Sequence, residues 1–153
     1  MKNSKKAPAY QPKTDFIRVA TATPEVAIGD VATNLLAIKD LYDKAVDAHV
    51  ALVVFPELSL TGYTIQDLVG QPTLLRNARN ALIDLAQYSA GKNTALIVGL
   101  PFVVGNAIYN SAAFINDGAI RGVVPKQNLP TYNEFYEKRW YQAWQNKQNT
   151  DKR

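Results

Sequence analysis

Two kinds of hydrophobic pattern follow one another along this chain. Apolar runs at 50–55 and 94–100 show no alternation with polar residues, which is typical of strands buried on both faces of a sheet. A similar run at 16–22 predicts a first strand. Apolar residues recur at helical spacing over 31–45 and 73–88, which predicts two amphipathic helices. This order of strands and helices predicts an α/β fold with neighbouring parallel strands.

Residues that favour caps and turns mark the ends of these segments. Asp30 is suited to cap the first helix, and Gly91 is suited to end the second. The sequence Asn116-Asp117-Gly118 separates the segments 107–116 and 119–124 and predicts a β-hairpin. Because a hairpin adds antiparallel strands, we expect a mixed sheet.

Composition and charge narrow the classes of function. The 153 residues, 47% of them hydrophobic, suffice for one folded domain with a core. The net charge of +4 comes from the ends: residues 1–14 and 138–153 each carry +4, so residues 15–137 carry −4. A basic arm at 1–14 is therefore expected to be flexible, and the acidic body argues against nucleic acid as a partner. No apolar run is long enough for a membrane span, so we expect no membrane partner.

Two ionisable residues follow apolar strands immediately after a proline. Pro56 cannot donate to a β-ladder, so it places Glu57 at the carboxyl end of a buried strand, where open α/β sheets build their sites. Lys126 follows Val124-Pro125 in the same way, after another strand expected to be buried. A carboxylate among apolar walls can act as a base, and an ammonium can stabilise an oxyanion in acyl transfer. Alternatively, Glu57 caps a turn and Lys126 is a surface charge.

Two sequence blocks carry a resemblance to a known family. The first is Phe55-Pro56-Glu57-Leu58-Ser59-Leu60-Thr61-Gly62-Tyr63, and the second runs from 124 to 139. With these blocks, residues 15–139 resemble part of a nitrilase, or carbon–nitrogen hydrolase, domain. The portions Leu129-Pro130-Thr131-Tyr132 and Glu134-Phe135-Tyr136-Glu137-Lys138-Arg139 are most similar to the amino-terminal glutaminase domain of the glutamine-dependent NAD synthetase branch.

The resemblance implies a fold, a chemistry and partners. The fold is a partial nitrilase-like α-β-β-α sandwich with mixed sheets, about half of the full domain. Glu57 matches the general base and Lys126 the lysine that supports the tetrahedral intermediate. Tyr132 matches a position that holds the substrate glutamine, and Glu134 matches a second acid lining the site. Packing alone would equally explain Tyr132, and a helix-start acid would explain Glu134.

The same branch implies what accompanies the glutaminase. Its ammonia passes to a carboxyl-terminal synthetase domain that uses ATP and Mg to form NAD. We expect that domain and its cofactors to be missing from this chain, which itself is expected to hold no metal. Full-length relatives imply a cytoplasmic location and a homo-oligomer.

The chain departs from the family pattern in two respects. It contains no cysteine, whereas the family's nucleophile is a cysteine thiol, so we expect the chain alone to be inactive. The resemblance also stops at about Trp140, which leads us to expect a frameshift, premature stop or assembly error, and a polar, basic tail at 140–153 outside the family. Half a sandwich exposes apolar surface, so we expect marginal stability or aggregation.

Two other functions stay open. The chain could be part of a different nitrilase-superfamily amidase, acting on small aliphatic or carbamoylated substrates. It could instead be a non-catalytic interaction module that pairs its open sheet with an intact homologue. An ATP-binding domain encoded downstream would favour the synthetase, and co-purification with a full-length synthetase would favour the module.

Overall fold

The computed structural model describes residues 16–145, so the expected arm at 1–14 lies outside the described residues, as does the end of the expected tail. The strands are β1 (Val19–Thr21), β2 (Leu52–Val54), β3 (Ala95–Val104), β4 (Ala107–Asn116) and β5 (Ala119–Pro125). The α-helices are α1 (Val31–Asp47) and α2 (Pro72–Tyr88), and 3₁₀ helices occupy Tyr63–Gly70 and Glu137–Arg139.

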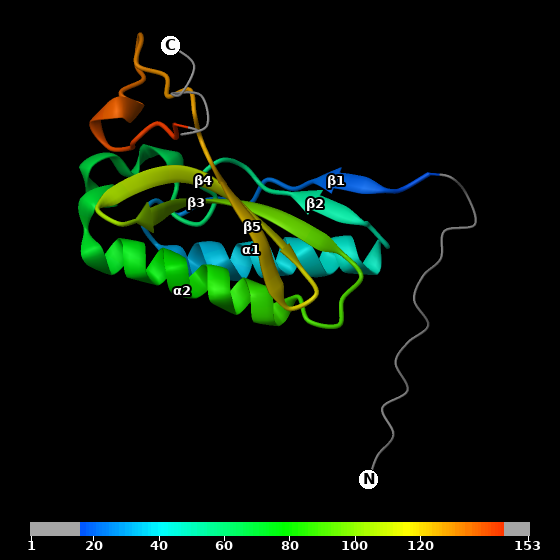
Figure 1. The fold of residues 1–153 in the computed structure, drawn as a ribbon. Helices are drawn as coiled ribbons and strands as arrows, with labels where there is room; N and C mark the ends of the chain where they lie inside the picture. The colour runs from blue at the N-terminus through cyan, green and yellow to red at the C-terminus, as the bar shows by residue number, and fades with distance from the viewer. Residues whose placement is uncertain (1–15, 146–153) are drawn as a thin grey trace.

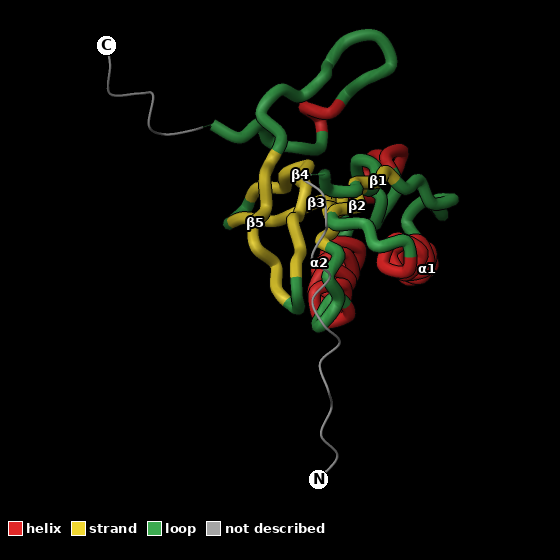
Figure 2. Tube along the Cα trace, turned by 90° about the vertical axis from the view of Figure 1, so that its right-hand side faces the viewer, coloured by secondary structure: helices red, strands yellow, loops and turns green. Residues whose placement is uncertain are grey.

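The strands form one mixed sheet in the order β1-β2-β3-β4-β5. β1, β2 and β3 run parallel, whereas β4 and β5 are antiparallel additions. Both α-helices lie on one face of this sheet, and the segment after β5 projects beyond its end (Figures 1 and 2). The predicted mixed α/β fold is confirmed, including its hairpin.

Local chemistry explains where the elements begin and turn. The Asp30 carboxylate accepts a hydrogen bond from the Thr33 backbone N–H at 3.0 Å and caps α1 as predicted. Asp117 and Gly118 both take positive φ at the tip of the β4–β5 hairpin, the conformation that a two-residue turn needs. The Asp117 carboxylate also accepts a 2.9 Å hydrogen bond from the Gly91 N–H, which ties the hairpin to the end of α2.

The structure differs from the sequence expectations in strand length and burial. β3 continues past Leu100 to Val104 and joins β4 through a hairpin at Gly105, because β4 pairs with it along its whole length. The strands expected at 16–22 and 50–55 are each only three residues long. β5 is an edge strand with one neighbour, so it is not buried as expected, and Val124 is 68% exposed.

The core lies between the sheet and its two helices. Alternate strand residues such as Val53, Leu96 and Val98 point towards the helices and are fully buried. They meet the apolar faces of α1 and α2, which contribute Ile38, Tyr42, Leu82 and Leu85. This one-sided packing fixes the ends of β2 and β3, from which the site is built.

The opposite face of the sheet carries apolar side chains without a covering layer in the described residues. Val54 lies opposite Ile97, and Ile97 lies opposite Phe114, so the three share this face. Val124 joins them through its pairing with Ala112. Phe114 and Val124 are exposed. Because exposed apolar patches of this kind can drive association, the aggregation expected from the sequence stays a prediction.

None of the helices between residues 16 and 145 combines the length and the apolar character that crossing a bilayer requires.

Tyr42 makes the unfolding free energy of this core depend on pH in the alkaline range. Its ring is fully buried, and its hydroxyl donates a 2.6 Å hydrogen bond to the Thr94 carbonyl. Burial, followed by the nearby Asp43 and Asp117 carboxylates, raises the pKa of Tyr42 from 10.0 to about 12. A raised pKa contributes stability that is complete below pH 10 and is lost as the pH rises to about 12. We expect this loss to be about 2–3 kcal/mol of unfolding free energy.

The variant Tyr42→Phe tests this dependence. It loses the hydrogen bond and about 1 kcal/mol at pH 8, but its unfolding free energy falls less than that of the parent between pH 10 and 12. Chemical denaturation followed by circular dichroism at both pH values measures the difference. Tyr136→Phe, at an exposed position, serves as the control. Equal alkaline losses in the parent and Tyr42→Phe would contradict the assignment.

Candidate active site

A tight turn after β2 presents Glu57 at the edge of the sheet. The Ser59 N–H donates to the Pro56 carbonyl at 3.2 Å, and Leu58 takes a positive φ of 51°. The turn rests on β3, because the Leu60 N–H donates to the Gly99 carbonyl at 3.1 Å. A Cβ on Gly99 would lie 2.2 Å from the Leu58 nitrogen, so only glycine allows this approach. Glu57 thus lies at the carboxyl end of β2.

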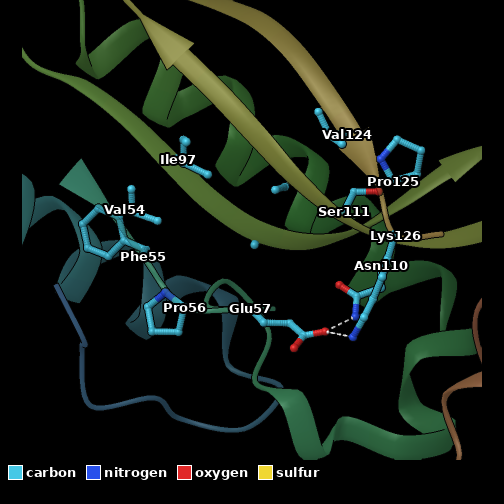
Figure 3. A pocket seen from close by; sticks show the side chains of 12 residues that line it. Val54, Phe55, Pro56, Glu57, Ile97, Asn110, Ser111, Val124, Pro125 and Lys126 are labelled. Atoms are coloured by element: carbon cyan, nitrogen blue, oxygen red, sulfur yellow. Dashed lines mark hydrogen bonds and ion pairs between the residues drawn. The ribbon is translucent and has the colours of Figure 1, made fainter. Parts of the chain in front are cut away.

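Lys126 follows the edge strand β5, and its side chain meets that of Glu57. It directly follows β5, and its backbone N–H donates to the Asn110 carbonyl at 2.8 Å. Its Nζ lies 2.7 Å from Glu57 Oε1 and 2.9 Å from Glu137 Oε1. Figure 3 shows the Glu57 and Lys126 side chains converging over the end of the sheet. The structure therefore brings together the two residues that the sequence singles out.

Asn110 and Glu137 complete this cluster, and sequence reasoning assigned neither a role. The Asn110 side-chain amide donates a hydrogen bond to Glu57 Oε1. Glu137 is only 1% exposed, and its Oε1 also accepts a 2.8 Å hydrogen bond from the Tyr63 hydroxyl. An asparagine inside the apolar strand segment was the available signal for Asn110. Glu137 lies in the resembling block 124–139, but its burial depends on the fold of that segment.

The charges of the cluster are fixed by these contacts. Burial alone lowers the pKa of Lys126, but its hydrogen bonds to Glu57 and Glu137 outweigh burial and leave that pKa raised. Burial and then the hydrogen bond to Glu137 raise the pKa of Tyr63. At neutral pH the cluster therefore holds a cationic amine and a neutral phenol beside two carboxyl groups. Among the described residues, no hydrogen bond occupies Glu57 Oε2, so this oxygen is available to take a proton.

A pocket of about 370 Å³ opens beside the pair on the uncovered face of the sheet. Apolar side chains such as Val54, Ile97 and Val124 form much of its wall, with Glu57, Asn110 and Lys126 at its polar side (Figure 3). The remaining lining residues are Phe55, Pro56, Gly99, Ser111, Ala112 and Pro125. A base and a cation beside an apolar wall suit a small molecule with one polar head, such as a carboxamide.

The structure does not bring Tyr132 and Glu134 into this cluster. Tyr132 is 65% exposed, with its ring 5.8 Å from that of Phe135. Glu134 is exposed as well. Among the described residues, neither makes a hydrogen bond or an ion pair to Glu57 or Lys126. Their assigned roles stay predictions, and the buried acid beside Lys126 is Glu137.

The beginning of the expected tail packs back onto the site. The Trp144 N–H donates to the Lys126 carbonyl at 3.0 Å, and the Gln142 N–H donates to the Ile108 carbonyl at 2.8 Å. Tyr141 is buried in the core. The Trp140 indole donates to the Asp67 carboxylate at 2.8 Å, which links this segment to the 3₁₀ helix Tyr63–Gly70. Residues 140–145 thus pack against the backbone of Lys126 and of β4.

No metal centre is visible in the part of the chain that the structure describes: residues 16–145 contain no group of three or more His, Asp or Glu side chains arranged to hold a metal ion.

Comparisons with known proteins identify the family of the chain. The family model for carbon–nitrogen hydrolases matches residues 18–150, past the boundary at 139 that the sequence predicts. The glutamine-dependent NAD(+) synthetase of Mycobacterium tuberculosis H37Rv is 47% identical over 131 residues, which are 86% of this chain and 19% of that protein. The synthetase of Xylella fastidiosa 9a5c is 34% identical, with 85% of this chain and 24% of that protein covered.

Solved structures give the same result for the fold. The glutamine-dependent NAD(+) synthetase of Cytophaga hutchinsonii superposes with a TM-score of 0.81 at 27% identity, over 86% of this chain and 22% of that one. An amidase from Nesterenkonia superposes with a TM-score of 0.71 at 22% identity, over 85% of this chain and 49% of that one, which shows the fold alone. This chain spans about a fifth of the curated relatives named above. With the family match over most of its length, the chain belongs to the carbon–nitrogen hydrolases.

Proposed function

We propose that this chain supplies part of a glutaminase site that hydrolyses the side-chain amide of glutamine and delivers ammonia for NAD formation. The observation that carries the proposal is the 2.7 Å contact between Lys126 Nζ and Glu57 Oε1 at the polar side of an apolar pocket. The 47% identity to a glutamine-dependent NAD(+) synthetase supports this substrate over the small amides of other family members.

The proposed chemistry is acyl transfer to a thiol. Glu57 Oε2 takes the proton of a cysteine thiol, and the thiolate attacks the amide carbon. Lys126 has three N–H donors, of which two are held by Glu57 and Glu137, so the third remains for the developing oxyanion. The C–N bond then breaks, and Glu57 returns its proton to the leaving nitrogen to form ammonia. Water hydrolyses the resulting thioester, giving glutamate and restoring the thiol.

Further components belong to the same proposal. Because this sequence contains no cysteine, the thiol comes from outside it. A synthetase domain that uses ATP and Mg, assembly into a homo-oligomer and a cytoplasmic location are proposed from the family resemblance. Binding of glutamine by Tyr132 and Glu134 stays part of the proposal, through a rearrangement that would bring these exposed side chains to the pocket.

The chain by itself is expected to release no ammonia from glutamine above the uncatalysed background. The base and the cation are present, but without a thiolate no acyl intermediate forms. A coupled assay with glutamate dehydrogenase measures the released ammonia. Ammonia release that is abolished by Glu57→Gln would contradict this expectation.

A chimera tests the proposed function itself. In it, this chain replaces the segment of the Mycobacterium tuberculosis synthetase to which it aligns. We expect glutamine hydrolysis within about tenfold of the parental enzyme, a barrier difference below about 1.4 kcal/mol. NAD formation with an ammonium salt in place of glutamine serves as the control for folding. A chimera that forms NAD from the ammonium salt but does not hydrolyse glutamine would refute the proposal.

A further inference from the structure

Asn110 contacts both members of the Glu57–Lys126 pair. Its backbone carbonyl accepts the Lys126 N–H at 2.8 Å, and its side-chain amide donates to Glu57 Oε1. The residue is 3% exposed and lies on β4, whose neighbouring strands pair with it on both sides. One residue of a central strand thus links the backbone of Lys126 to the carboxylate of Glu57.

The pair needs such a link because its two members come from separate and partly exposed segments. Glu57 lies in a turn after β2, and Lys126 follows the edge strand β5. Their side chains are 43% and 31% exposed. An ion pair at this exposure is only weakly stabilising, because solvent screens it and ordering two long side chains costs entropy, so it does not by itself hold one geometry.

Asn110 is also a buried polar residue next to apolar positions of β4, which needs a physical explanation. On the same face of β4, the positions that follow at alternate residues are Ala112, which lines the pocket, and Phe114, which pairs with Ile97. A buried amide in such a place is costly unless its hydrogen bonds are made. Its donor is directed at the oxygen that also accepts from Lys126, which leaves Glu57 Oε2 without a hydrogen bond among the described residues.

We propose that Asn110 is a positioning residue that holds Glu57 Oε1 against Lys126 and thereby directs Glu57 Oε2 to the substrate. Its catalytic consequence rests on the proposed function, whereas the positioning itself does not. Removing the amide donor frees the Glu57 side chain to leave Lys126, and the lysine then loses one of its two carboxylate partners.

The test is competitive acetylation of lysine amines in the parent chain and in Asn110→Leu, read by peptide mass spectrometry at submicromolar protein. The exposed Lys44 provides the internal reference for reactivity. We expect Lys126 to react about tenfold faster in Asn110→Leu, because loss of an adjacent opposite charge lowers an amine pKa by about one unit. Asn116→Leu makes the same substitution six residues further along β4 and should leave Lys126 unchanged.

Lys39 reports whether the variant is folded, because it is largely buried in its ion pair with Asp84. If Lys39 also becomes more reactive in Asn110→Leu, that variant has unfolded, and Asn110→Ser, whose shorter side chain cannot reach Glu57, decides instead. Unchanged Lys126 reactivity in a folded variant overturns the proposal. Since the assay involves neither glutamine nor a thiol, its outcome is independent of whether the chain serves a glutaminase.

Discussion

Glu57→Gln is expected to lower glutamine hydrolysis by the chimera about a thousandfold. Glutamine has the shape of glutamate, and its Oε1 can still accept hydrogen bonds from Asn110 and Lys126. It cannot take the thiol proton, however, and a positioned general base contributes about 10²- to 10⁴-fold to the rate. The loss should lie mainly in kcat, because the carboxylate acts on the nucleophile rather than on bound glutamine. Initial rates of ammonia release across a range of glutamine concentrations separate kcat from KM.

Two controls accompany this variant. Glu25→Gln makes the same substitution at an exposed glutamate outside the site and should leave the rate unchanged. NAD formation from an ammonium salt should also be unaffected in Glu57→Gln, since it bypasses the amide. Retention of more than a tenth of the chimera's glutaminase rate by Glu57→Gln would rule out its role as the base.

Gly99→Ala is expected to lower the unfolding free energy of the chain by about 3 kcal/mol or more. The added Cβ would lie 2.2 Å from the Leu58 nitrogen and 2.7 Å from the Pro56 carbonyl oxygen. Backbone atoms cannot rotate away as a side-chain end can, so the turn must separate from β3. That movement would also break the Leu60–Gly99 hydrogen bond and shift the turn that carries Glu57. Urea denaturation followed by circular dichroism measures the change.

The matched control for this effect is Gly122→Ala. Gly122 also lies within a strand, but a Cβ there would meet no atom within 4 Å. This substitution should be neutral or slightly stabilising, because alanine loses less backbone entropy on folding. If Gly99→Ala proved as stable as Gly122→Ala, the close approach of the turn to β3 would not exist in solution.

The order of elements could be predicted from the sequence because each signal is local. Helical spacing marked α1 and α2, and Asp30 and Asn116-Asp117-Gly118 marked a cap and a hairpin. The extension of β3 to Val104 was missed because it depends on pairing with β4 rather than on its own residues. The exposure of β5 was missed for a related reason. The burial of a strand depends on its position in the sheet, and an apolar run in the sequence does not determine that position.

The candidate site shows the same division. Glu57 and Lys126 could be singled out, because a proline and a charge after an apolar strand form a local pattern. Asn110 and Glu137 could not, because their importance comes from contacts with distant residues. Glu134 and Glu137 are three positions apart, and only the path of the segment after β5 buries Glu137 and leaves Glu134 exposed. Sequence spacing does not determine such a path.

A double-mutant cycle on glutamine hydrolysis by the chimera tests the central claim most directly, namely that Glu57 and Lys126 act together on one substrate. The rates of Glu57→Gln, Lys126→Met and the double variant are compared with that of the chimera. Residues that act as a unit are strongly non-additive, so the double variant should be no more than about tenfold slower than the slower single variant. Losses that multiply would show that the two residues act independently, and a Lys126→Met variant at the full rate would contradict the account.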